Sequence, residues 1–382
     1  MIEFNFLINT QTIFGNGSIN ELNRIIKNNN YRHIAVVLDH NLKHSVPVGR
    51  LCDYLNLISE CVIIDSDISE PTYEKLEEKR FTYKDFNIDA IVGIGGGSTI
   101  DLAKGLAVLY TNQGPAISYR GLDQFKEPIP PIIAIPTTAG TGSEVTPNAS
   151  FIDTIEKRKM GINGEAIRPQ YAILDPTLTL SCPKGPTLST GVDSLVHATE
   201  AFVAKKSNPM AKMFAKEGFQ IVLENLPLLT SDLDNITLRE RVMYGAFLSA
   251  IALMNSGTGP AAAMSYPLGV HFGVPHGIGG GIFLPYVIQH NIDSGFFDYA
   301  DLHQNTDNNQ STERKATAFI ESIWDTWKEL KLSQNLGDFG ITPNDIPLFV
   351  SDTMDLKAAL DQNPLPFYEN EIESILRKLI IE

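Results

Sequence analysis

The sequence predicts an α/β domain built on a mostly parallel sheet, followed by an all-helical domain. Up to about residue 180, short uninterrupted apolar runs alternate with amphipathic stretches, a pattern typical of parallel strands covered by helices on both faces. After Asp175-Pro176, long patterns of helical spacing replace these runs. Because 382 residues exceed one ordinary core, we predict two domains, residues 1–180 and 181–382.

The individual elements follow from the same patterns. Apolar runs predict strands at 34–38, 61–65, 90–94, 131–135 and 171–175, and helical patterns lie between them at 16–29, 72–87 and 98–111. The stretch 149–162 alternates differently and carries charge at 156–159, which predicts a hairpin leaving the sheet. In the second half, helices are expected at 187–204, 208–225, 236–254, 260–271, 311–330 and 369–381, and the rest of 332–382 is weakly patterned.

Composition narrows the class of partner. The formal net charge of −15 speaks against nucleic acid or an anionic membrane as the main partner, although a local basic cluster can still bind a small anion. The three cysteines show no metal-type spacing, so we expect reduced thiols and a cytoplasmic protein. No stretch resembles a signal peptide or reaches the length of a membrane span.

A glycine-rich turn, Gly95-Gly96-Gly97-Ser98, joins the strand at 90–94 to the helix at 98–111. Glycines let a ligand approach the backbone, and a helix N-terminus offers free N–H groups to a phosphate, so the order favours nucleotide binding over a purely geometric turn. Ser98 stands where the usual dinucleotide fingerprint has its third glycine. The candidate ribose-binding acid, Asp39, precedes the glycines, which indicates a different strand order. Asp39 favours NAD over NADP on charge grounds, and its alternative role is to open a turn.

Two further stretches carry polar side chains. The loop 136–144 follows the strand at 131–135, at the same sheet edge as the glycine turn, and either binds a polar ligand or caps a helix. The segment 191–202 predicts the start of a helix capped from Thr187, Ser189 or Thr190. On that helix Asp193 and His197 stand at i and i+4 on one face, as half of a metal site or as a hydrogen-bonded pair.

The segment Pro260–Gly277 ends in His271 and His276. Taken with the glycine turn, the loop at 138–144 and the Asp193–His197 pair, it makes roughly residues 10–295 resemble the iron-containing (group III) alcohol dehydrogenases. The resemblance implies the dehydroquinate synthase-like fold of that family and NAD(P)-dependent hydride transfer between an alcohol and an aldehyde or ketone. It also implies a divalent metal, Fe or Zn, and a homodimer or larger homo-oligomer.

The resemblance assigns roles to individual residues. The turn would hold the pyrophosphate, Asp39 the adenosine ribose, and the threonines of the loop would lie near the nicotinamide. The implied cofactor-binding residues are Asp39, Gly95, Gly96, Gly97, Ser98, Asp101, Thr137, Thr138, Thr141 and Lys159. Three of the four metal ligands would be Asp193, His197 and His276.

The chain departs from the family at the fourth ligand. The family has a histidine fourteen residues before His276, where this chain has Ala262, and Tyr266 replaces another active-site histidine. Two alternatives follow. Three ligands and water hold the metal more weakly, with His271 as a replacement ligand. Otherwise the metal is absent, and Tyr266 or His271 polarises the carbonyl as a hydrogen-bond donor; His271 has a packing role as its alternative.

Three functions are therefore weighed. We expect an NAD(P)-dependent oxidoreductase acting on a small, polar alcohol or carbonyl compound, because Ser265-Tyr266 alters the pocket expected for a simple primary alcohol. The alternatives are a non-redox lyase similar to dehydroquinate synthase and a catalytically silent nucleotide-binding protein. The lyase needs a dense basic pocket, which the sequence does not indicate.

Overall fold

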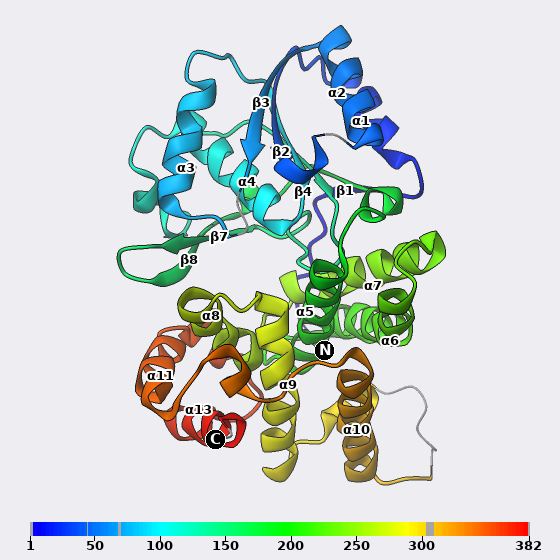
Figure 1. Cartoon of the computed structure of the whole chain (residues 1–382), viewed down its shortest axis with the longest axis vertical. Coiled ribbons are helices and arrows are strands. Elements are labelled where there is room, and N and C mark those ends of the chain that lie inside the picture. Colours follow the sequence, from blue (N-terminus) through cyan, green and yellow to red (C-terminus); the bar gives the residue numbers. More distant parts are fainter. Residues whose placement is uncertain (1–2, 44, 68–69, 303–308, 381–382) are drawn as a thin grey trace. The chain divides into compact units, whose positions relative to one another are not determined.

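The computed structural model describes residues 3–43, 45–67, 70–302 and 309–380 (Figure 1). These residues form two compact units. The first, here called the sheet unit, comprises Ile8–Thr138 and Gly142–Cys182. The second, the helical unit, comprises Pro183–Glu382 together with Ala139–Thr141 and the residues up to Leu7. Among the described residues, none of the helices is long and apolar enough to cross a membrane.

The sheet unit is organised around a six-stranded sheet in which every neighbouring pair is parallel. All five strands expected from apolar runs are confirmed. The sixth strand, at the edge, was not expected because its half-exposed sequence lacks an apolar run. In spatial order the strands are β1 (Gln11–Phe14), β9 (Tyr171–Leu174), β6 (Ile132–Pro136), β4 (Ala90–Gly95), β2 (His33–Asp39) and β3 (Glu60–Ser66).

Helices cover both faces of this sheet, as predicted. Alternate side chains of β2 enter opposite cores: Ala35 and Val37 lie with residues of α3 (Tyr73–Arg80) and α4 (Gly97–Thr111), whereas Val36 lies with residues of α1 (Glu21–Asn28) and α2 (Val46–Ile58). α2 was not predicted. The helix expected at 16–29 opens as a 3-10 turn, Ser18–Asn20, and that expected at 72–87 ends as one, Phe81–Tyr83.

The sheet unit contains a second sheet of three strands, which packs against α4 through β7. It contains β5 (Gly121–Leu122), β7 (Asn148–Asp153) and β8 (Arg158–Asn163). β7 and β8 pair antiparallel from Asn148–Asn163 to Asp153–Arg158, so the hairpin predicted at 149–162 is confirmed.

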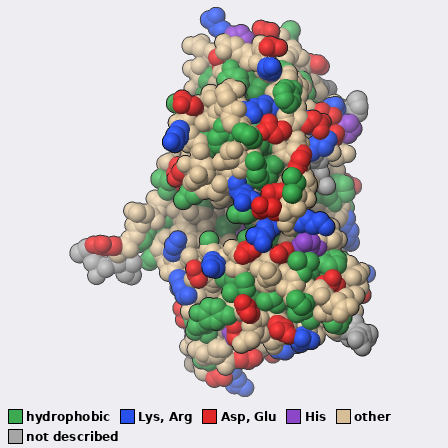
Figure 2. Space-filling model, turned by 90° about the vertical axis from the view of Figure 1, so that its left-hand side faces the viewer, with side chains coloured by type: hydrophobic (Ala, Val, Ile, Leu, Met, Phe, Trp, Pro, Cys, Tyr) green, Lys and Arg blue, Asp and Glu red, His purple; other side chains and the backbone are tan. Residues whose placement is uncertain are grey.

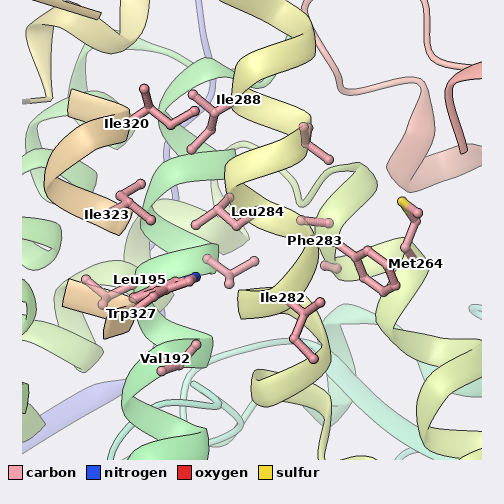
Figure 3. Close-up of a cluster of buried hydrophobic side chains, with 14 of the residues drawn as sticks. Val192, Leu195, Met264, Ile282, Phe283, Leu284, Ile288, Ile320, Ile323 and Trp327 are labelled. Atoms are coloured by element: carbon pink, nitrogen blue, oxygen red, sulfur yellow. The ribbon is translucent and has the colours of Figure 1, made fainter. Parts of the chain in front are cut away.

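The helical unit packs its long helices around one apolar core, part of which Figure 3 shows. Val192 and Leu195 enter it from α5, Phe283 from α9 and Trp327 from α10. The predicted helices are all present, whereas α9, α11 and α12 were not expected. The bounds are α5 (Lys184–Val203), α6 (Pro209–Ser231), α7 (Ile236–Met254), α8 (Pro260–Phe272), α9 (His276–Asp293), α10 (Thr312–Leu330), α11 (Ile346–Met354), α12 (Lys357–Leu360) and α13 (Glu369–Leu379).

One buried hydrogen bond shows how this core accommodates a proline inside α9. Pro285 has no N–H group, so it cannot donate to the carbonyl of Gly281 four residues earlier. The indole Nε1 of Trp327 on α10 donates to that carbonyl at 2.7 Å instead. The polar group of a large core side chain is thereby satisfied.

The predicted beginning of α5 was wrong. The helix starts at Lys184, seven residues before Gly191, and no side chain caps it. Thr187 lies inside the helix and accepts a hydrogen bond from Arg239 Nη1, while the hydroxyl of Thr190 donates to the carbonyl of Pro186. Gly185 and Pro186 lie in the first turn of this helix, and proline is tolerated there because the first N–H groups of a helix have no partner within it.

Positive and negative side chains are mixed on one face of the molecule. On the face shown in Figure 2, the Lys and Arg side chains are interspersed with Asp and Glu rather than gathered on one element.

Candidate active site

The glycine turn lies where β4 ends and α4 begins, in the sheet unit. Gly96 is the N-cap residue of α4, and no side-chain hydrogen bond caps this helix N-terminus. A Cβ on Gly95 would lie 2.6 Å from Thr99 Oγ1 and 2.9 Å from the Cβ of Asp39, so only glycine fits. The turn therefore combines a helix N-terminus with Asp39 as an immediate neighbour.

The second loop lies beside this turn. Gly95 pairs with Pro136 across β4 and β6, the backbone N–H of Thr137 donates to the Gly95 carbonyl at 2.9 Å, and the Thr138 side chain approaches Gly96. The predicted placement of both loops at one sheet edge is confirmed. The alternative that the loop caps a helix is wrong, because β7 follows it.

Asp39 also has the structural role considered as its alternative. Its carboxylate accepts from the backbone N–H of Asn41 at 2.9 Å and caps the short 3-10 helix His40–Leu42. Ligand contact and turn formation are compatible, since a carboxylate has about four acceptor positions. Lys159 on β8 is part of an ion pair with Glu70, at 2.6 Å between Nζ and Oε2.

A buried polar cluster underneath these loops was missed in the sequence. Lys104 on α4 is fully buried and donates from Nζ to the carbonyls of Thr146 and Asn148, at 2.8 and 2.7 Å. One turn earlier, Asp101 accepts from the Ser143 hydroxyl and from the backbone N–H of Ser150. These contacts tie α4, whose first turn faces the glycines, to the loop that follows β6.

Burial shifts the pKa values in this cluster. Desolvation lowers the pKa of Lys104 to about 8, with the Asp101 and Glu144 carboxylates acting in the opposite direction. Burial raises the pKa of Asp101 and of Glu144, which Lys104 partly offsets. A lysine inside the apolar run 102–109 was the sequence signal for this cluster, since lysine is rarely buried without partners.

The helical unit brings Asp193, His197 and His276 together. Asp193 and His197 lie one turn apart on α5 and are almost completely buried, and His276 is the first residue of α9. One ligand atom from each lies within 4.8 Å of the others, and no other such group occurs among the described residues. The predicted i, i+4 arrangement of Asp193 and His197 on one helix face is what brings the pair together.

The distances fit a divalent ion better than direct hydrogen bonds. Nε2 of His197 lies 3.4 Å and Nε2 of His276 lies 3.8 Å from Asp193 Oδ1, beyond the usual range of about 2.7–3.2 Å for N–H···O bonds. Ligands about 2.1 Å from a tetrahedral ion are separated by roughly 3.4 Å. Nδ1 of His197 is buried with no hydrogen-bond partner, which is unusual for an imidazole that only packs. The residues present therefore fit the metal implied by the family.

Glycine explains how His276 reaches α5. A Cβ on Gly277 would collide with the backbone oxygen of Ser189 and lie 2.8 Å from the Cβ of Asp193. The absence of a side chain at this position lets the first turn of α9 pack directly on α5. The sequence Pro275-His276-Gly277 thus places the imidazole beside the Asp193 carboxylate.

The position of the missing ligand lies at the start of α8. Ala262 is 2% exposed and belongs to the apolar core. Just before it, the N-terminus of α8 is capped by Glu200 of α5, whose carboxylate accepts from the backbone N–H groups of Gly259 and Ala261 at 2.7 Å. Burial raises the pKa of Glu200, and these donors act against that rise. No local sequence pattern indicates the role of Glu200, because its partners are about 60 residues away.

The two replacement candidates behave differently. The ring of Tyr266 lies against that of His276, with centroids 4.9 Å apart. His271, near the C-terminal end of α8, instead pairs through Nε2 with Asp352 of α11 at 2.7 Å. The structure therefore groups Tyr266, but not His271, with the three candidate ligands.

The fold and these residues together are those of a nucleotide-dependent enzyme with a metal-type ligand set. Comparison with known proteins agrees. Residues 9–176 match the model of the iron-containing alcohol dehydrogenases, and residues 187–380 match that of the C-terminal domain of the same family.

Full-length relatives give the same result. The chain is 30% identical to the 1,3-propanediol dehydrogenase of Citrobacter freundii, with 98% of each chain covered. It is 29% identical to the NAD-dependent methanol dehydrogenase of Bacillus methanolicus, over 98% of this chain and all of the relative. A crystal structure of a 1,3-propanediol oxidoreductase superposes with a TM-score of 0.94 at 28% identity, covering 99% of this chain and all of the other.

The chain belongs to the iron-containing alcohol dehydrogenase family. The expected fold and the expected enzyme class, an oxidoreductase of alcohols and carbonyl compounds, are confirmed. The relatives do not support the lyase alternative, because they are dehydrogenases.

Proposed function

We propose that the protein transfers hydride between NAD(H) and a small polar alcohol or the corresponding aldehyde or ketone, assisted by a divalent iron or zinc ion. The observation that carries this proposal is the grouping of Asp193, His197 and His276 at spacings suited to a metal. The sheet unit would bind the nucleotide and the helical unit would hold the metal.

In this proposal, the three candidate metal ligands, the ion and the nicotinamide have different roles. Asp193, His197 and His276 would hold the ion, with water or substrate completing its coordination in place of the side chain lost at Ala262. When bound, the ion supplies Lewis-acid polarisation of the substrate oxygen, and the nicotinamide supplies or accepts hydride. The carboxylate of Asp193 lowers the positive charge of the site, and the burial of the α5 pair excludes water from that side.

Tyr266 is the proposed proton donor to the substrate oxygen in the direction of carbonyl reduction. Its ring lies against His276, so its phenol belongs to the surroundings of the proposed ligands. A phenol can both donate and accept a hydrogen bond, which suits a group that gives up a proton during reduction and takes one during oxidation.

NAD is preferred over NADP in this proposal. The Asp39 carboxylate lies beside Gly95 at the carboxyl end of β2, where a 2′-phosphate would meet like charge. The pyrophosphate would bind at Gly95, Gly96, Gly97 and Ser98, and the remaining contacts would come from Asp101, Thr137, Thr138, Thr141 and Lys159. We expect a lower KM for NAD than for NADP.

An activity assay with one matched pair of variants tests the proposal. Wild-type protein with NADH and a panel of two- to four-carbon polar aldehydes should show NADH oxidation. Asp193→Asn should lower kcat/KM on the order of 100-fold or more, because a Lewis acid contributes several kcal/mol to transition-state stabilisation. Asp234→Asn, at an exposed position of the same unit, is the control. An Asp193→Asn variant as active as this control would refute the proposal.

Two broader assignments are part of the same proposal. We expect a homodimer or larger homo-oligomer, as the family resemblance implies, and a sedimentation run that gives the monomer mass would contradict it. A cytoplasmic location is supported by the three cysteines, which form no disulfide among the described residues, as suits a reducing compartment.

A further inference from the structure

A serine on α8 makes two hydrogen bonds next to the proposed metal ligands. Ser265 is completely buried, and its hydroxyl donates to the carbonyl of Ala262, three residues earlier, at 2.6 Å. The same oxygen lies 2.5 Å from Nδ1 of His276 on α9. Ser265 thus connects the backbone at the missing-ligand position to the imidazole of an existing candidate ligand.

The direction of the second bond follows from counting protons. A hydroxyl has one proton, and the Ala262 carbonyl can only accept, so the Ser265 proton points at Ala262. The short contact with His276 then requires Nδ1–H of the imidazole to donate to Ser265 Oγ. A neutral imidazole carries one N–H group, so its Nε2 has the lone pair. Nε2 is the atom that lies 3.8 Å from Asp193 Oδ1.

We propose that Ser265 is a positioning residue that fixes His276 in the Nδ1–H tautomer and so presents the Nε2 lone pair to a divalent cation shared with Asp193 and His197. The proposal rests on the metal site of the proposed function. Hydrogen bonds to the remote nitrogen of a ligating imidazole typically change metal affinity 10–100-fold. Such support matters more where Ala262 leaves three protein ligands instead of four.

Packing holds Ser265 in place. α8 is fastened to α5 through the Glu200 carboxylate, which binds the backbone at Gly259 and Ala261. On the other side, a Cβ on Gly279 would lie 2.9 Å from the Cβ of Ser265, so α9 passes close to this serine. Because α5, α8 and α9 all contribute to the same apolar core, the hydroxyl and the imidazole have little freedom to separate.

The test measures the tautomer and the metal affinity separately. In metal-free full-length protein labelled with ¹⁵N-histidine, long-range ¹H–¹⁵N correlation should show His276 as the Nδ1–H form. Ser265→Ala should produce a mixture of tautomers. In a titration with Co²⁺ followed by its visible absorption, Ser265→Ala should bind 10–100-fold more weakly than wild type.

Ser249→Ala is the matched control. Ser249 is also completely buried in a helix, α7, and also donates to a backbone carbonyl, that of Gly245, at 3.0 Å. This control should leave both the tautomer and the Co²⁺ affinity unchanged, and circular dichroism checks that each variant is folded.

The outcomes separate the two proposals. Ser265→Ala with an unchanged His276 tautomer and unchanged Co²⁺ affinity overturns the role of Ser265. If wild type binds no Co²⁺ while Ser265→Ala still releases the tautomer, the proton assignment stands and the metal part of the proposed function fails.

Discussion

The glycine turn after β4 is formed mainly by the backbone, whereas the proposed metal site on α5 and α9 is formed by side chains. The turn uses backbone N–H groups and small residues, and Lys104 and Asp101 tie the helix that follows it to the segment 146–150. The ligand group uses three particular side chains, His276 among them, placed by helix packing. A backbone site tolerates many side-chain changes provided its shape survives, whereas a ligand site changes with each substitution, as Ala262 illustrates.

We expect the largest loss of stability when the buried contacts of Lys104 on α4 are removed. Lys104→Met leaves the carbonyls of Thr146 and Asn148 without their donor and the Asp101 carboxyl without its cation. Leaving these buried polar groups without their partners costs about 3–5 kcal/mol, so urea denaturation should show a loss of that size, with weaker NADH binding. Lys75→Met removes an exposed pair with Glu78 and should leave the free energy of unfolding nearly unchanged. Equal losses in the two variants would contradict the supporting role of the cluster.

The helical unit has a corresponding support in Glu200. In Glu200→Gln, one carboxylate oxygen becomes an amide nitrogen facing backbone N–H groups of α8, which leaves buried donors unsatisfied. We expect a loss of about 1–3 kcal/mol in the free energy of unfolding. Glu224→Gln, exposed on α6, should change it by less than about 0.5 kcal/mol. A Glu200→Gln protein as stable as wild type would show that the cap does not hold α8.

The smallest expected effect is a pH dependence of the free energy of unfolding. The folded protein releases the Lys104 proton near pH 8, but the unfolded chain keeps it to about pH 10.5, so folding releases a proton between these values. Higher pH therefore favours the folded state, because the folded protein no longer has to bury the charged form of Lys104. Relative to Lys104→Met, wild type should gain about 1.5 kcal/mol of stability from pH 8 to 9.5. A parallel pH dependence of the two proteins would indicate an ordinary lysine pKa.

The elements that a local sequence pattern determines could be predicted from the sequence alone. Apolar runs predicted the strands, including β4 with its glycine turn, and the i, i+4 spacing predicted that Asp193 and His197 share a helix face. α9 was missed because its glycines, which include Gly277, look like a loop. In the folded chain they allow close helix packing, which outweighs a cost of about 1 kcal/mol per interior glycine.

The remaining features depend on partners far apart in the chain. Glu200 meets backbone groups about 60 residues later, and His271 meets Asp352, 81 residues away. Ser265 and His276 are separated by 11 residues, but their contact depends on how α8 and α9 pack. No local periodicity contains this information, so sequence reasoning identified Ser265 only as a replacement and not as a partner of the histidine.

The most direct test of the account is the metal content of protein purified without chelators. Elemental analysis of wild type should give close to one equivalent of iron or zinc per chain, and Asp193→Asn should contain little. Ala262→His, which adds a fourth imidazole, should retain the metal more firmly during dialysis against a weak chelator. Wild-type protein that is fully active and contains no metal would contradict the account.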